Sequence, residues 1–130
     1  MVVKQKSHLS IVRYWWKSLT GITDEYMRDM LGKSKQYSVI ILTEGLNANK
    51  PGVEKIKWEH GRRNFSLRRS GLLSIVCPIS GGGSIVGIGI FNASVDEVKK
   101  IMDEDPAVRA DVLRCQVLDC RSFPGDCLPK

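Results

Sequence analysis

One histidine stands on an otherwise apolar stripe of a predicted helix that spans residues 52 to 69. On a helical wheel, the stripe that must face a sheet consists of Val53, Ile56, His60 and Leu67, with His60 at its centre. An imidazole can accept and release a proton near neutral pH. His60 is therefore a candidate catalytic general base.

A carboxylate occupies a comparable position in a second predicted helix. The apolar side of that helix groups Val98, Ile101 and Met102, and Asp105 falls on the same side, directly before a proline. A buried carboxylate without a partner is costly, so a contact between Asp105 and His60 would satisfy both groups. Asp105 would then fix the tautomer of the imidazole and raise its basicity.

The same two residues also have a purely structural interpretation. A histidine on an apolar stripe is often a hydrogen-bonded core residue, and an Asp-Pro pair often ends a helix. Two further residues are candidates for substrate binding. Arg109 could neutralise an acid group of the substrate, and Cys77 lies beside a proline at the end of a run of strand residues. Cys77 could also be a nucleophile or a small packed thiol.

No cofactor or metal ion is predicted. A strand follows Gly81-Gly82-Gly83, whereas a phosphate-binding loop needs a helix N-terminus or a Lys-Ser/Thr pair there. The spacing of Cys115, Cys120 and Cys127 matches no common zinc motif. We expect the cysteines to be reduced thiols.

The elements that must position these residues alternate between strand and helix patterns. Strands are predicted at 37–43, 72–77, 84–91 and 113–120, and helices at 52–69, from a Ser94–Glu97 capping box to Pro106, and in a further turn at 107–111. This β-α-β-β-α-β order predicts an α+β fold with a ferredoxin-like split antiparallel sheet and both helices on one face. The other face would be bare and apolar, which predicts a homodimer through the sheet faces, possibly within a higher oligomer.

The chain is expected to have three parts. Residues 1–36 form a helical extension, residues 37–125 form the α+β barrel domain, and residues 126–130 form a tail. The extension carries the cluster Tyr14-Trp15-Trp16 and a short helix, for which Thr23 is the predicted N-cap and Gly32 the left-handed residue after the C-terminus.

Several short motifs occur in the order found in the YCII-related family, which residues 37 to about 123 resemble. The motifs are Trp58-Glu59-His60, Ser70-Gly71-Leu72-Leu73, Cys77-Pro78, Ala93 to Val98, and Asp103-Glu104-Asp105-Pro106. The resemblance implies a dimeric α+β barrel with a cleft between helices and sheet, and a catalytic pair that matches His60 and Asp105. One characterised member resembles a dehydrochlorinase acting on a chlorinated aromatic diol, while most have no assigned reaction.

The chain departs from the family pattern in three places. Cys77-Pro78 replaces the usual Gly-Pro after the second strand, and Cys120-Arg121-Ser122-Phe123 replaces the aromatic end of the last strand. Residues 1 to 36 have no counterpart in the family.

The composition limits the remaining classes of protein. The chain has 130 residues, of which 42% are hydrophobic and 26% charged, so extensive disorder is not expected. No apolar stretch approaches the length of a membrane span, and charged residues interrupt the first thirty positions, where a secretory signal would lie. We therefore expect a cytoplasmic protein without membrane contact.

Three functions are compatible with these patterns. The first is a lyase or isomerase that acts on a small anionic or cyclic substrate, with His60 moving a proton. The second is a non-catalytic ligand-binding or assembly module, in which the His60–Asp105 pair is structural. The third is a nucleic-acid binder, suggested by the net charge of +6 and by Arg62, Arg63, Arg68 and Arg69. We favour the first two, because a helix face rich in Lys and Arg is usually only solvated and no aromatic-basic recognition motif accompanies these arginines. Trp58 and Phe65, seven residues apart, are expected to form a flanking apolar ridge that meets the N-terminal segment or another subunit.

Overall fold

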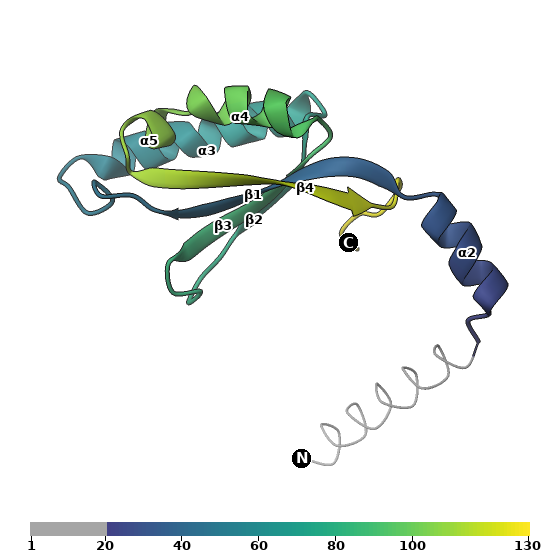
Figure 1. Ribbon diagram of the computed structural model, residues 1–130. Helices are drawn as coiled ribbons and strands as arrows, with labels where there is room; N and C mark the ends of the chain where they lie inside the picture. Colours follow the sequence, from purple (N-terminus) through teal and green to yellow (C-terminus); the bar gives the residue numbers. More distant parts are fainter. Residues whose placement is uncertain (1–20) are drawn as a thin grey trace, which may run out of the picture. The chain divides into compact units, whose positions relative to one another are not determined.

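The computed structural model describes residues 21–130 and has an α+β fold with a four-stranded antiparallel sheet (Figure 1). Residues 35–122 form one compact unit, and residues 21–34 and 123–130 belong to another. The predicted Tyr14-Trp15-Trp16 cluster lies outside the described residues. Within the described part of the chain, no helix is both long and apolar enough to cross a bilayer.

The compact unit confirms the predicted β-α-β-β-α-β order. Its elements are β1 (Lys35–Glu44), α3 (Val53–Arg69), β2 (Leu73–Pro78), β3 (Ile85–Phe91), α4 (Val95–Asp103), α5 (Pro106–Arg109) and β4 (Leu113–Ser122). The strands lie in the order β2-β3-β1-β4, and every neighbouring pair is antiparallel. β2 includes Pro78, one residue beyond the predicted strand, because an edge strand tolerates the missing N–H of proline.

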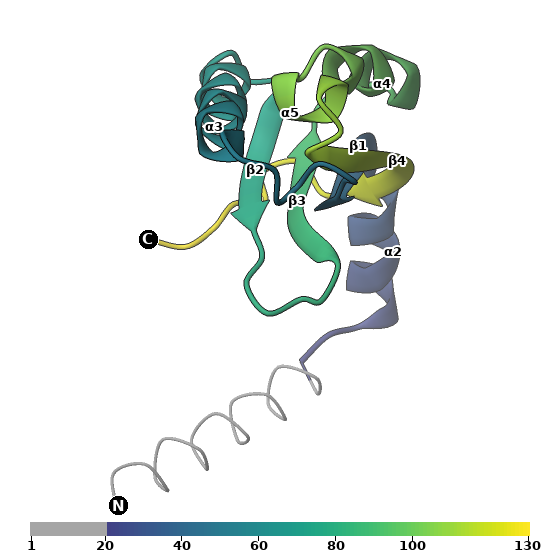
Figure 2. The ribbon, with the colours of Figure 1, turned by 90° about the vertical axis from the view of Figure 1, so that its left-hand side faces the viewer.

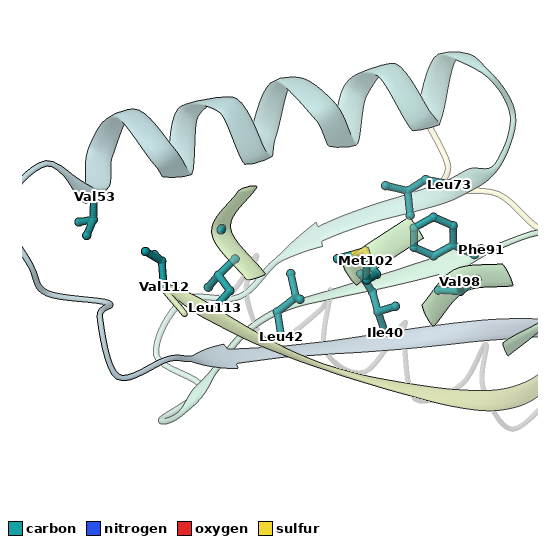
Figure 3. Packing of buried hydrophobic residues seen from close by; sticks show 10 residues of the cluster. Ile40, Leu42, Val53, Leu73, Phe91, Val98, Met102, Val112 and Leu113 are labelled. Atoms are coloured by element: carbon teal, nitrogen blue, oxygen red, sulfur yellow. The ribbon is translucent and has the colours of Figure 1, made fainter. Parts of the chain in front are cut away.

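The three helices α3, α4 and α5 cover one face of the sheet (Figures 1 and 2). Residues on this face of β1 alternate with residues on the other, and Ser38, Ile40 and Leu42 are buried beneath the helices. Opposite them on β3 lie Phe91, Gly89 and Gly87. The core packs between this face and the helices (Figure 3), and its buried members include Leu73, Val98, Met102, Val112 and Leu113.

The opposite face of the sheet is apolar and is not covered by any helix of residues 35–122. Val39 pairs with Ile90 and with Leu118, and Ile41 pairs with Ile88. These side chains are partly exposed, and Leu118 is 40% exposed. The homodimer expected from this surface stays a prediction.

The other unit contains the short helix α2 (Asp24–Gly32). Thr23 is its N-cap, as predicted, since the Tyr26 amide donates to Thr23 Oγ1 at 3.1 Å. The prediction for Gly32 was wrong, because Gly32 is the last helical residue and its φ is not positive. The Lys33 amide donates to the Met30 carbonyl at 3.0 Å, so a tightened right-handed turn ends the helix.

The loop after β1 is fastened to the loop before β4. The Gly45 amide donates to the Val112 carbonyl at 2.9 Å, and the Asn47 amide donates to the Asp111 carbonyl at 2.9 Å. A Cβ atom on Gly45 would collide with the Asp111 carbonyl, so this position requires glycine.

We predict that Gly45→Ala lowers the free energy of unfolding by about 3 kcal/mol, because the two backbones must move apart. Urea denaturation measures this change. The matched control is Gly61→Ala in α3, where an added Cβ meets no atom within 4 Å and should stabilise the helix by up to about 1 kcal/mol. Equal destabilisation of the two variants would contradict the prediction.

Candidate active site

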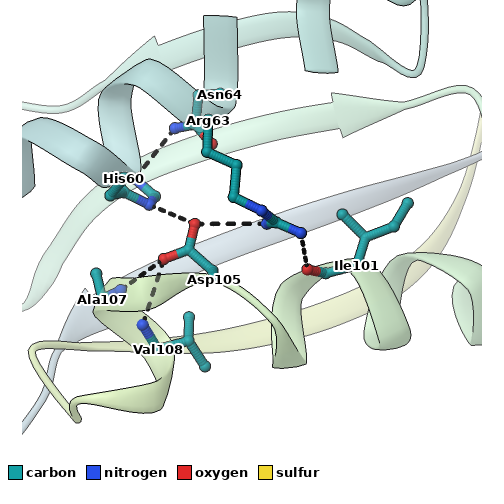
Figure 4. A network of polar contacts seen from close by, with 7 residues as sticks. All are labelled: His60, Arg63, Asn64, Ile101, Asp105, Ala107 and Val108. Carbon is teal, nitrogen blue, oxygen red and sulfur yellow. Dashed lines mark hydrogen bonds and ion pairs between the residues drawn. The ribbon is translucent and has the colours of Figure 1, made fainter. Parts of the chain in front are cut away.

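The predicted contact between His60 and Asp105 is present in the structure (Figure 4). His60 Nδ1 lies 2.8 Å from Asp105 Oδ2; the Asp105 side chain is fully buried, and the His60 side chain is 13% exposed. An ionised carboxylate only accepts hydrogen bonds, so Nδ1 carries the hydrogen. The basic lone pair of neutral His60 is therefore on Nε2.

Asp105 pairs with His60 as expected, but it does not end a helix: the helix predicted to reach Pro106 ends at Asp103, and Asp105 has an extended backbone before the next helix. It is the N-cap of α5, and its Oδ1 accepts from the amides of Ala107 at 2.9 Å and Val108 at 3.3 Å. Pro106 fits the first helical position because it has no amide hydrogen to satisfy. One carboxylate oxygen thus caps the N-terminus of α5, and the other accepts the hydrogen bond from the imidazole.

Arg63 is a third partner of the carboxylate, and the sequence analysis missed it. Its Nη1 lies 3.6 Å from Asp105 Oδ2, and its Nη2 donates to the Ile101 carbonyl at 2.6 Å. Arg63 was grouped with the solvated arginines of α3, yet its side chain is only 25% exposed. The guanidinium fastens α3 to the last turn of α4 and adds positive charge beside Asp105.

The environment of Asp105 favours its ionised form. Burial by itself would raise the pKa of Asp105, but the hydrogen bond from His60 and its charge, together with the amides of Ala107 and Val108, outweigh burial and lower the pKa below its usual value. Asp105 is therefore a carboxylate at neutral pH and can stabilise a positive imidazole.

Asn64 is the second residue that the sequence analysis missed. It follows His60 by one helical turn, is 8% exposed, and its Nδ2 lies 3.1 Å from His60 Nε2. With the hydrogen of the imidazole on Nδ1, Asn64 donates to Nε2. Asn64 Oδ1 is buried, and no hydrogen-bond partner for it occurs within residues 21–130. A substrate must displace the Asn64 amide to reach Nε2.

His60 and Asn64 line a cavity of about 340 Å³ between α3 and the sheet. This volume is within the range of small-molecule sites, which begins at about 300 Å³. Gly87 and Gly89 lie opposite on β3 and leave room because they carry no side chains. A Cβ on Gly87 would approach Leu42 Cδ1 at 3.4 Å, an ordinary contact distance.

The cavity wall is mostly apolar, and its charged lining residues are Glu44 and Lys57. Cys77 also lines the cavity, although the alternation along β2 directs its side chain to the face away from the helices. Arg109 is exposed at the end of α5 and is not among the lining residues. The structure therefore brings His60 and Asp105 together, and it places Cys77, but not Arg109, at the wall of the cavity. The substrate-binding roles of Cys77 and Arg109 stay predictions.

The described cysteines do not gather into a metal site. Among residues 21–130, no three His, Cys, Asp or Glu side chains are grouped closely enough to hold a metal ion. Cys115 is partly buried, and burial together with the charges of Asp105 and Asp103 raises the pKa of its thiol to about 11. Cys115 is thus a neutral thiol at physiological pH.

The chain matches no protein-family model and no curated protein. Among solved structures, it is similar to 5-chloro-2-hydroxyhydroquinone dehydrochlorinase from Burkholderia phenoliruptrix AC1100 in complex with 2,5-dihydroxybenzoquinone. The sequences are 17% identical, the alignment covers 68% of this chain and 95% of the other, and the TM-score is 0.44.

We predict that Asp105→Asn lowers the free energy of unfolding at neutral pH by about 3 kcal/mol, because it removes the buried partner of His60 and Arg63. The folded-state pKa of Asp105 is lowered, so its contribution is complete above the unfolded-state pKa of about 3.9 and is lost as the pH falls through the folded-state value. Urea denaturation over a pH series should therefore show a difference that shrinks below about pH 4. A constant difference would contradict this assignment.

We predict that iodoacetamide modifies Cys115 about a hundredfold more slowly than an ordinary exposed thiol near pH 8, because the raised pKa leaves little thiolate. Mass spectrometry of timed digests measures each rate, with the exposed Cys127 as the internal reference. Asp105→Asn removes one of the charges that raise the pKa and should speed the modification of Cys115. Equal rates at Cys115 and Cys127 would contradict the prediction.

Proposed function

We propose that this protein is a small-molecule enzyme of YCII-like type, a lyase or isomerase in which His60 transfers a proton within the cavity. One observation carries the proposal: an imidazole that lines a cavity of small-molecule size is backed by a fully buried carboxylate at 2.8 Å. A positioned imidazole of this kind contributes a factor of about a hundred to ten thousand in rate.

In this proposal His60 Nε2 is the base and Asp105 is the positioning residue. The Asn64 amide moves away from Nε2 when the substrate binds, and Nε2 then removes a proton from a carbon atom of the substrate. In an elimination, the electron pair of the broken C–H bond forms a double bond, and the leaving group departs with its own electron pair. In an isomerisation, the imidazolium returns the same proton at another atom. Asp105 Oδ2 neutralises the imidazolium in both cases.

The lining of the cavity supports a small, mostly apolar substrate, such as a cyclic one. Lys57 is the cation that lines the cavity, so it is better placed than Arg109 to meet an acid group. Glu44 lines the same cavity, so the two charges offset each other there. We therefore expect at most one acid group on the substrate.

One observation favours a second candidate, a non-catalytic ligand-binding or assembly module. Both nitrogens of His60 already have partners, Asp105 at 2.8 Å and Asn64 at 3.1 Å, as a structural histidine requires. The two candidates differ in whether Nε2 becomes available to a ligand.

We predict that a small cyclic compound moves the ¹⁵N resonance of His60 Nε2 while Nδ1 stays protonated. The chain has two histidines, so the variant His8→Gln leaves a single imidazole to observe. The probes are cyclic carboxylic acids, phenols and enones. Gly87→Val fills the cavity from β3 and should abolish the response, whereas Ile90→Val, on the opposite face of β3 and outside the cavity lining, should preserve it.

A compound that binds is then tested for turnover by proton NMR. His60→Ala should lower turnover by a hundredfold or more while the protein remains folded. If no compound moves the Nε2 resonance, or if the variant keeps full turnover, the catalytic role is wrong and the structural interpretation of the pair holds.

A further inference from the structure

A second hollow, of about 470 Å³, is lined by residues of α3 alone, and it shares Lys57, Gly61 and Phe65 with the lining of the first cavity. Its lining includes Trp58, Gly61, Phe65 and the cations Lys57, Arg62 and Arg69. Arg63 is not among the lining residues and reaches α4 instead. Trp58 is 70% exposed and Phe65 is 63% exposed, so both rings offer free faces. We call this hollow the α3 groove.

The axial spacing of Trp58 and Phe65 on α3 matches that of a short stack of planar groups. Trp58 and Phe65 are seven residues apart on one helix, which corresponds to about 10.5 Å along its axis. A stack of ring, base, base and ring contains three separations of about 3.4 Å each, or about 10 Å in total. Gly61 lies between the rings, and a Cβ there would meet no atom within 4 Å, so the helix surface between them is open.

The charges around the rings complement phosphate. Three cations line the α3 groove, and no carboxylate is among its lining residues. Arg62 contacts Glu59 at 3.2 Å, but both side chains of that pair are exposed, so the contact is weak. Free aromatic faces beside cations are the features with which proteins bind single-stranded nucleic acids.

We propose that the α3 groove binds single-stranded nucleic acid, with bases stacked on Trp58 and Phe65 and phosphates held by Lys57 and Arg69. The sequence analysis treated the aromatic ridge and the basic face as separate features, and the structure places them in one hollow. An acidic peptide fits less well, because it supplies negative charge without a planar group at every residue. A purely apolar partner would have to desolvate the cations without pairing them.

The test measures the binding of a fluorescent oligouridylate to the full chain by anisotropy. Trp58→Ala should weaken binding by tenfold or more, and Trp58→Phe should restore most of the affinity, since a ring of any kind can stack. Arg69→Gln should also weaken binding and lower the slope of log K against log salt by about one. Lys55→Gln removes a charge from the same helix outside the α3 groove and should have little effect.

Four outcomes would overturn the proposal. These are no binding of the oligouridylate, binding that Trp58→Ala leaves unchanged, equal binding of a duplex of the same length, and binding of polyglutamate with the same dependence on Trp58. The last outcome would assign the α3 groove to an acidic peptide. His60→Ala should leave oligouridylate binding intact, so this proposal and the proposed enzyme activity can fail separately.

Discussion

The arrangement of the helices depends on one buried negative charge. The Asp105 carboxylate is fully buried, and its partners come from separate parts of the chain: the imidazole and guanidinium from α3, and two backbone amides from α5. An ion that has lost its water is stable only if such partners replace it. This requirement fixes α3 against the junction of α4 and α5, and it holds the His60 ring in a single orientation.

The cavity depends on a second constraint, which is the register of the sheet. Gly89 pairs with Ile40 and Gly87 pairs with Leu42, so the positions beneath α3 on β3 carry no side chains. Phe91 lies on the same face of β3 and fills the space at the other end of the sheet, where the core is closed. The fold is therefore packed at one end and hollow at the other, and the imidazole lies over the hollow end.

The sequence was sufficient for the parts of the site that follow from local periodicity. The inward position of His60 follows from the helical repeat of its apolar neighbours, and the capping box of Ser94 and Glu97 is present as predicted. The same reasoning was wrong for Asp105, because α4 ends at Asp103 and the extended backbone before α5, not a helical repeat, directs this side chain inward. Asn64 and Arg63 were missed because polar residues on a helix were assumed to face solvent. The position of Asn64, four residues after His60, was an available signal, whereas the reach of Arg63 to Ile101 depends on how two helices pack. The family resemblance implied a cleft between the helices and the sheet, but the residues that line the cavity could not be predicted, because they depend on which residues of β1 oppose the glycines of β3.

α5, the shortest helix of the described residues, depends on its surroundings for stability. Four residues, Pro106–Arg109, are too few for a helix to persist in water without outside support. The support comes from the Asp105 cap at one end and from the Val112 amide, which donates to the Ala107 carbonyl at 2.9 Å, at the other. Val112 and Leu113 also form part of the cavity wall. The rigidity of that wall therefore depends on the ionised state of Asp105, although Asp105 is not a lining residue. A proton bound to Asp105 would weaken the cap of α5 and would thereby loosen the wall.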